Sequence, residues 1–297
     1  MNPGGSLNIR ARWQGGTLDA LEVRLQRPEI GRLFHGQNPA AIPKTIPFLY
    51  SLCAQAQRLA AETALALASE RPLRPLDPEP LWWECLHENL WRLLLDWPQA
   101  LGLEPAREAF ARWRNSPQGE RRAATVALIT GPLAETAAAI DARLGPLPAC
   151  DGTPPALAPE TQLARWQAGD PKPPAWATPG DVASAFATRL AAVRHAANRY
   201  VAAAPYPLAG AGGLGWGLAQ TWTARGVLSQ GLQLKDGQVR QFRIWAPTDC
   251  HFADSSALLR LLHGRSYTSA EAARRGLEQA ILALDPCLPH TLEIHHA

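Results

Sequence analysis

The chain has 297 residues, 46% of them hydrophobic, which is enough to bury the core of one large or two smaller domains. Its 29 basic and 26 acidic residues give a formal net charge of +3, and only three of the basic residues are lysines. Because these charges form no basic block, the balance argues against a nucleic-acid binder. We expect no apolar run to span a bilayer and no signal peptide in residues 1–6, and therefore a cytoplasmic protein.

The N-terminal half is predicted to be a hairpin followed by helices. Alternating apolar residues over 7–13 and 18–25 predict two short strands joined by a glycine turn. The Ala- and Leu-rich stretch 46–69 predicts one long helix, with Pro47 in its first turn and Cys53 near its start. Further helices are predicted over 80–97, 104–115 and 120–144, the last interrupted near its middle.

Helix 80–97 is rich in tryptophan, and at this spacing aromatic side chains favour a core over a cofactor wall. It also carries one Glu-x-x-His pair, Glu84 and His87. A di-iron bundle needs two such pairs on neighbouring helices and further carboxylates, so we exclude a di-iron site.

Residues 145–180 contain nine prolines and little periodicity. They are predicted to form a Pro-rich loop or insert, ordered only where Trp166 and Trp176 dock. A helix is then predicted over 181–203, capped by Asp181 or Gly180.

The C-terminal half alternates strands and helices. Residues 210–215 match a dinucleotide-binding fingerprint by letter, but a strand follows them where a helix is required, so we exclude this site. Strands are predicted over 218–224, 227–234 and 239–246, and helices over 255–263 and 270–284.

Five cysteines are spread at wide and irregular intervals, which argues against a disulfide framework and leaves metal binding open. One of them lies between Pro286 and Pro289, where the stiffened backbone would aim a soft ligand. The same turn also suits a helix stop followed by a small buried residue. The cysteines are Cys53, Cys85, Cys150, Cys250 and Cys287.

Four separated features share an order with a known family: Cys53, Arg225-Gly226, Pro247-Thr248 and Cys287. This order resembles the large subunit of nickel-iron hydrogenases, and its departures resemble the shorter HupK/HoxV family of hydrogenase maturation proteins. The resemblance covers most of the chain and leaves the Pro-rich middle unmatched. It implies a mostly helical α+β fold, with a helical core and small antiparallel β-sheets, in a single domain over residues 1–297.

The resemblance also implies a reduced metal site. In the large subunit, one Cys-x-x-Cys on the first helix and one at the C-terminus hold nickel, and the second cysteine of each pair bridges to iron. Here the first motif begins with Tyr50 and keeps only Cys53, while the closing motif keeps Cys287 and has His290 in place of its second cysteine. The remaining thiolates are then too few for a nickel with four sulfur ligands, whereas an iron already carrying carbonyl and cyanides needs few further ligands.

The family contacts the cyanides through an arginine and a serine or threonine, and Arg225 and Thr248 occupy those positions. The chemistry is suitable, because a guanidinium and a hydroxyl are good donors to anionic cyanide nitrogens. The sequence differs from the family at two places near this match. Ala224 precedes the arginine where the family has proline, and Cys250-His251 replace Trp-Asn. The glutamates tied to proton transfer have no counterpart, which implies that hydrogen turnover is absent.

The resulting hypothesis is a non-catalytic scaffold or chaperone that holds or transfers an Fe(CN)2(CO) unit. Cys53, Cys287 and His290 would be the metal ligands, and Arg225 and Thr248 would hold cyanides. The implied partners are HypC-type chaperones, the HypD-type carrier and the hydrogenase large subunit, with no nucleic acid and no membrane. Two alternatives stay open: a metal-free mimic of the large subunit that recruits chaperones, and a zinc protein using Cys287, His290 and Cys250 or His251.

Overall fold

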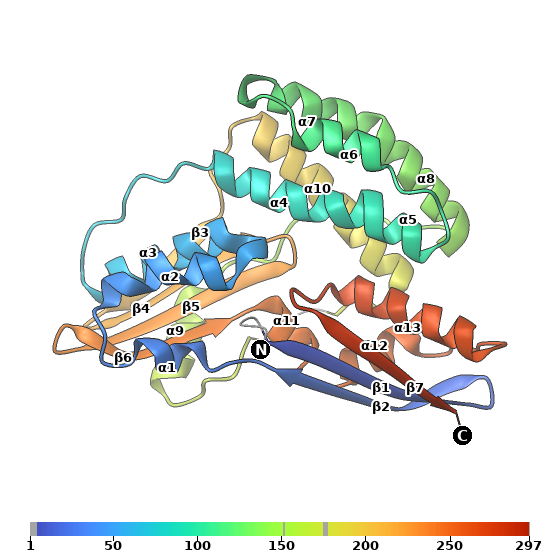
Figure 1. The fold of residues 1–297 in the computed structure, drawn as a ribbon. Helices are drawn as coiled ribbons and strands as arrows, with labels where there is room; N and C mark the ends of the chain where they lie inside the picture. Colours follow the sequence, from blue (N-terminus) through green and yellow to red (C-terminus); the bar gives the residue numbers. More distant parts are fainter. Residues whose placement is uncertain (1–4, 151, 175–177, 297) are drawn as a thin grey trace.

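Two small β-sheets and a layer of helices make up the fold in the computed structural model, which describes residues 5–150, 152–174 and 178–296 (Figure 1). The first sheet has the strand order β2-β1-β7. Strands β1 (Ser6–Gln14) and β2 (Thr17–Gln26) form the predicted antiparallel hairpin.

Strand β7 (His290–His296) was not predicted, and it runs parallel to β1, with Leu7 opposite His290. The expectation of purely antiparallel sheets is therefore wrong for this sheet. The physical reason is the helical crossover before β7, which lets the chain return beside β1 in the same direction.

The second sheet is antiparallel in the order β3-β4-β5-β6. The first of its strands was missed in the sequence, because its glycine-rich residues have low strand propensity. The glycines of this strand instead allow α3 (Ala54–Ala68) to lie close to the sheet: a Cβ on Gly212 would lie 2.8 Å from the Cβ of Leu67. The strands are β3 (Leu208–Gly213), β4 (Trp216–Thr223), β5 (Gly226–Lys235) and β6 (Gln238–Trp245).

Helix α3 (Ala54–Ala68) packs against β3, β4 and β5. The predicted single helix over 46–69 is wrong, because the chain leaves helical geometry at Tyr50, where φ is −127° and ψ is 68°. Pro47 consequently lies inside α2, and Cys53 is the residue directly before α3. The elements preceding α3 are α1 (Ile30–Phe34), a 3-10 turn (Pro39–Ala41), α2 (Ile42–Leu49) and a second 3-10 turn (Ser51–Cys53).

The predicted loop over 145–180 contains a helix, α9 (Pro159–Gln167), which contacts β3 and β4. Its Trp166 packs edge-on against Trp216 and Trp245, so the docking of Trp166 was foreseen but not the helix around it. Trp176 lies outside the described residues. Cys150 is exposed.

Of the tryptophans predicted to form a core, Trp82 and Trp97 are almost fully inaccessible, whereas Trp83 is half-buried and Trp91 is exposed. A π-helical turn (Arg92–Asp96) joins α4 to α5, and Gly131 separates α7 from α8. The helices are α4 (Glu79–Trp91), α5 (Trp97–Ala100), α6 (Arg107–Arg114), α7 (Arg121–Thr130), α8 (Pro132–Leu144) and α10 (Val182–Val201).

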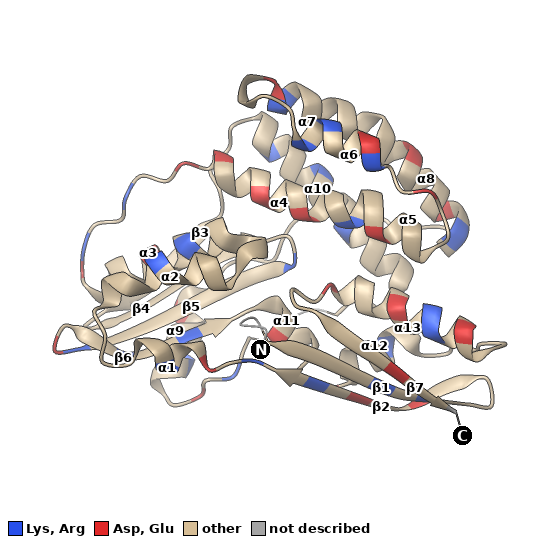
Figure 2. Ribbon diagram, in the orientation of Figure 1, with Lys and Arg blue, Asp and Glu red and all other residues tan. Residues whose placement is uncertain are grey.

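Residues Gln118–Leu144 are, by length and composition, long and apolar enough to cross a membrane. An 18-residue window within this segment has a mean hydropathy of 1.4, and 28% of the window is buried. This corrects the expectation that no run is long enough. The buried core helix of a protein without a membrane span passes the same test, so one such segment alone assigns no membrane role. Acidic and basic side chains occur on the helices of this layer and on both sheets (Figure 2).

A second core lies between β1 and the C-terminal helices. Helix α13 also contacts α5 and α10, so it joins this core to the helical layer (Figure 1). Ser269 caps α13 by accepting a hydrogen bond from the amide of Ala272 at 3.1 Å. The helices in this part are α11 (Pro247–His251), α12 (Ser256–Leu262) and α13 (Ala270–Leu284).

Candidate functional site

The fold brings Cys53 and Cys287 to one site although they lie at opposite ends of the chain. Cys53 ends the 3-10 turn before α3, and Cys287 lies in the loop between α13 and β7. The charge of Cys287 contributes to raising the pKa of Cys53, and Arg225 interacts electrostatically with both sulfurs. The two thiols and the guanidinium therefore lie within electrostatic range of one another in a partly buried region.

Cys53 is held as a neutral thiol. Burial, the charge of Cys287 and the charge of Glu84 raise the pKa of Cys53 to about 12. Its nearest polar partner is Gln57, whose Nε2 lies 3.7 Å from the sulfur. Gln230 donates to Gln57 Oε1 at 2.5 Å and so fixes that amide. A metal bound here would displace the thiol proton.

Cys287 has a richer set of donors. The hydroxyl of Thr248 lies 3.2 Å from the sulfur and also accepts the backbone N–H of Cys287 at 3.2 Å. Nη2 of Arg27 donates to the same sulfur at 3.2 Å. Thr248 is 1% exposed, because α11 begins directly after β6 and points this side chain inward. The Thr248 hydroxyl therefore holds both the sulfur and the backbone amide of Cys287.

Asp285 sets the direction in which the chain leaves α13. It adopts the left-handed conformation at the helix end, with φ of 46°, and is 1% exposed. Its carboxylate accepts from Arg92 at 2.7 Å and from Arg189 at 2.9 Å. Burial opposes ionisation, but Arg225, Arg189 and Arg92 together lower the pKa of Asp285 to about 2. This cluster holds the turn that carries Cys287.

Arg225 is held between two acids. Its Nη2 donates to Glu88 at 3.0 Å, and its Nε donates to the carbonyl oxygen of Asp285 at 3.1 Å. Burial lowers the pKa of Arg225, but Asp285 and Glu88 outweigh it and raise the pKa above its ordinary value. The guanidinium is thus a fixed cation beside the thiols.

Glu84 caps α3 from the neighbouring helix α4. Its two carboxylate oxygens accept from the backbone N–H groups of Gln55 at 2.7 Å and Ala56 at 3.0 Å. Burial raises the pKa of Glu84 to about 7. The sequence presented this residue only as half of an excluded Glu-x-x-His pair, yet it holds the turn that carries Cys53.

Sequence reasoning missed Arg27, Asp249 and the role of Tyr50. Asp249 anchors Arg27 by accepting from its Nε at 2.5 Å. Burial raises the pKa of Tyr50 to about 12, with contributions from Asp249, Cys287 and Cys53. The position of Tyr50, where the motif lacks its first cysteine, was the one signal available. Arg27 carried none, because Asp249 and Cys287, to which it donates, lie 222 and 260 residues further along the chain.

The remaining candidate metal ligands from the sequence are His290, Cys250 and His251. His290 is exposed at the start of β7. Nδ1 of His251 lies 3.4 Å from the carbonyl oxygen of Leu284, and the Cys250 sulfur lies 3.6 Å from that of Ala246. Among the described residues, no group of three or more His, Cys, Asp or Glu side chains could hold a metal ion. A bare zinc ion would therefore find no preformed set of ligands in this part of the chain.

The fold is that of the hydrogenase large subunit. The nickel-iron-selenium hydrogenase of Desulfovibrio vulgaris Hildenborough matches with a TM-score of 0.67 at 10% identity, covering 92% of this chain and 94% of the hydrogenase chain. That of Desulfomicrobium baculatum has a TM-score of 0.61 at 10% identity, with 93% and 95% covered. An NAD+-reducing nickel-iron hydrogenase has a TM-score of 0.58 at 15% identity, with 92% and 93% covered.

Sequence similarity narrows this class to one family. The chain is 33% identical to the hydrogenase expression/formation protein HupK of Azotobacter vinelandii and 31% identical to HupV of Azotobacter chroococcum mcd 1, with 99% of each chain covered. HupK of Rhodobacter capsulatus is 28% identical, with 93% and 95% covered. No protein-family profile matches the chain. The chain belongs to the HupK/HupV family of hydrogenase expression/formation proteins.

Proposed function

We propose that this protein is a non-catalytic scaffold of nickel-iron hydrogenase maturation that holds or transfers an Fe(CN)2(CO) unit between Cys53 and Cys287. The names of its relatives, hydrogenase expression/formation proteins, support a maturation role rather than catalysis. The observation that supports the finer proposal is that two thiols from distant parts of the chain lie within electrostatic range of each other and of Arg225.

The residues present fit this cargo better than they fit a bare metal ion. An iron carrying one carbonyl and two cyanides leaves few positions for protein ligands, and soft thiolates suit it. Cys53 and Cys287 would supply two such ligands, one from the turn before α3 and one from the loop after α13. In this proposal His290 is a third ligand, and its side chain would have to move from its position at the start of β7 to reach the iron.

The cyanides would be held by Arg225 and Thr248. A cyanide nitrogen accepts hydrogen bonds and carries negative charge, so a fixed guanidinium stabilises it strongly. Glu88 and Asp285 hold Arg225 in place, which reduces the entropy lost on binding. Thr248 now donates to Cys287, and when that sulfur binds metal its hydroxyl becomes free to face a cyanide.

Transfer would be controlled by protonation of Cys53. With a pKa of about 12, this thiol gives up its proton only when metal takes its place, and it regains one when the cargo leaves. A neutral thiol is a weak ligand, so the site suits temporary binding. We propose HypC-type chaperones and the HypD-type carrier as donors and the hydrogenase large subunit as a receiving partner, all in the cytoplasm.

Infrared spectroscopy with iron analysis tests the proposal on protein co-produced with the maturation machinery. We expect carbonyl and cyanide stretches and bound iron in the unmodified protein and in Cys150→Ser, whose sulfur is exposed. Cys53→Ser and Cys287→Ser should each lose most of the iron and these bands. Absence of the bands from the unmodified protein, or equal bands in all four proteins, would overturn the ligand assignment.

One observation favours the metal-free alternative. The sulfur of Cys287 already has two donors, Thr248 and Arg27, and Cys53 has Gln57, so the site is hydrogen-bonded without metal. Under this alternative the fold imitates a large subunit and recruits chaperones. Hydrogenase activity in cells carrying a Cys53→Ser and Cys287→Ser double variant decides between the two, since full activity supports the mimic and its loss supports the scaffold.

A further inference from the structure

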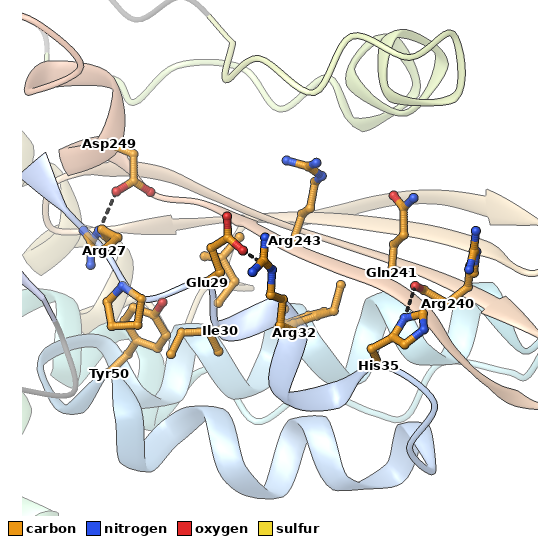
Figure 3. Close-up of a pocket in the computed structure, with 14 residues that line it drawn as sticks. Arg27, Glu29, Ile30, Arg32, His35, Tyr50, Arg240, Gln241, Arg243 and Asp249 are labelled. Atoms are coloured by element: carbon orange, nitrogen blue, oxygen red, sulfur yellow. Dashed lines mark hydrogen bonds and ion pairs between the residues drawn. The ribbon is translucent and has the colours of Figure 1, made fainter.

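A pocket of about 450 Å³ opens beside the thiol site, between α1, the outer strand β6 and Tyr50 (Figure 3). Gly31 makes this arrangement possible, because a Cβ there would lie 2.1 Å from the carbonyl oxygen of Phe242. Helix α1 can therefore approach the strand closely and leave the pocket next to it. We call this pocket the arginine pocket, after four of its lining residues: Arg27, Arg32, Arg240 and Arg243.

The arginine pocket has an excess of positive charge. Its two carboxylates are already paired, Asp249 with Arg27 at 2.5 Å and Glu29 with Arg32. Arg240 and Arg243 project from exposed positions on β6, and within the described residues neither has an acidic partner at ion-pair distance (Figure 3). Two guanidinium groups thus remain available to a ligand from solution.

Residues that line one part of the pocket adjoin the thiol site. Arg27 lines the pocket and donates to the sulfur of Cys287 at 3.2 Å. Tyr50 lines it too, and its pKa responds to the charges of both Cys287 and Cys53. The two cysteines are not among the lining residues, so Arg27 is the residue that joins the pocket to the Cys287 sulfur.

We propose that the arginine pocket is the access route by which an anionic iron-cyanide complex reaches Cys287. This inference rests on the proposed function, and it names the route and the residues that recognise the cargo outside the thiol site. Iron(II) with two cyanides and the thiolates of a carrier has a net negative charge. Guanidinium groups attract it, donate to its cyanide nitrogens, and concentrate it at the mouth.

Arg27 has a second part in this route. Its hydrogen bond covers the Cys287 sulfur, and its Nε stays anchored on Asp249. An anionic cyanide nitrogen arriving beside it offers a charge-assisted acceptor that competes with the sulfur for the guanidinium. The incoming complex therefore draws the guanidinium away from the sulfur that it is to bind.

The route is testable without any metal loading, by comparing anionic iodoacetate with neutral iodoacetamide as alkylating agents for Cys287. Both reagents report the same thiolate, so the ratio of their rate constants measures charge steering along the path. The proteins are the unmodified chain, the pocket double variant Arg240→Gln/Arg243→Gln, and the control double variant Arg107→Gln/Arg112→Gln on α6. Both pairs of arginines are exposed and remove the same charge.

At low ionic strength, we expect the iodoacetate to iodoacetamide ratio at Cys287, read by peptide mass spectrometry, to fall at least threefold in the pocket variant only. Hexacyanoferrate(II), an inert cyanide complex, should protect Cys287 from iodoacetamide at least tenfold less well in that variant. Equal iodoacetate to iodoacetamide ratios and equal protection of Cys287 in the three proteins would overturn the route. Protection of Cys287 by sulfate at the same ionic strength, or by an acidic peptide alone, would also overturn it. Because neither readout requires bound iron, the route can fail while the iron-binding proposal stands, and the reverse.

Discussion

The two sulfurs of the site differ in what holds them. Cys53 faces one amide and has a pKa of about 12, whereas Cys287 faces a hydroxyl and a guanidinium. The first sulfur is thus supported mainly by its position at the start of α3, and that position depends on the Glu84 carboxyl. Residues that touch no ligand therefore decide how the ligand residues behave.

Glu84 should give the protein a recognisable dependence of stability on pH. Its pKa in the folded state, about 7, lies above its ordinary value of 4.5. Between these two values the folded chain binds more protons than the unfolded chain, so the free energy of unfolding should fall as pH rises from 4.5 to 7. For a largely buried carboxyl we expect a decrease of about 1–3 kcal/mol from this group.

Urea denaturation at pH 5 and at pH 7 measures this effect. Glu84→Gln cannot ionise, so its free energy of unfolding should change less over this interval than that of the unmodified chain. Glu62→Gln, at an exposed position of α3, is the matched control and should keep the full decrease. Identical pH dependence in the Glu84 and Glu62 variants would contradict the role given to Glu84.

At the scale of helices and strands, a prediction was confirmed where residues close together in the sequence define the element. Helix α13 occupies the predicted residues because Ser269 caps it and its apolar residues repeat at helical spacing. Strand β7 and strand β3 were missed for different reasons. The partner of β7 is almost a chain length away, and β3 is defined by the close approach of α3 rather than by its own propensity.

The end of α13 illustrates a contribution that no local pattern reveals. Asp285 lies among Arg92, Arg189 and Arg225, which come from three other parts of the chain. We predict that Asp285→Asn destabilises the fold by about 3–5 kcal/mol, because it leaves buried guanidinium groups without their anion. Chemical denaturation measures the loss.

Asp236→Asn, in the exposed turn between β5 and β6, is the control for that substitution and should change stability by less than about 0.5 kcal/mol. If the Asp285 and Asp236 variants unfold at the same denaturant concentration, the cluster does not hold the turn that carries Cys287.

Across the whole molecule, the two thiols belong to different cores. Cys53 packs against the main core, and Cys287 packs against the core formed by β1 and the C-terminal helices. The order of motifs along the sequence predicted that these cysteines share a site, and this remains a prediction. The contacts of Arg27 and Asp285 gave no signal in the sequence, because they join residues that are far apart along the chain.

This arrangement gives a bound metal a structural consequence. A single iron shared by Cys53 and Cys287 would link the two cores across the site. Anything that binds only the folded chain stabilises it, so loaded protein should unfold at a higher temperature than metal-free protein. The serine variants of either cysteine should lose that increase.

Iron-edge X-ray absorption on the loaded protein tests the shared site most directly. We predict two sulfur neighbours per iron at about 2.3 Å, beside the short bonds to the diatomic ligands, and only one sulfur neighbour for the residual iron that Cys53→Ser or Cys287→Ser retains. An iron with no sulfur neighbours, or with a sulfur count that neither substitution changes, would contradict a metal held between these two cysteines.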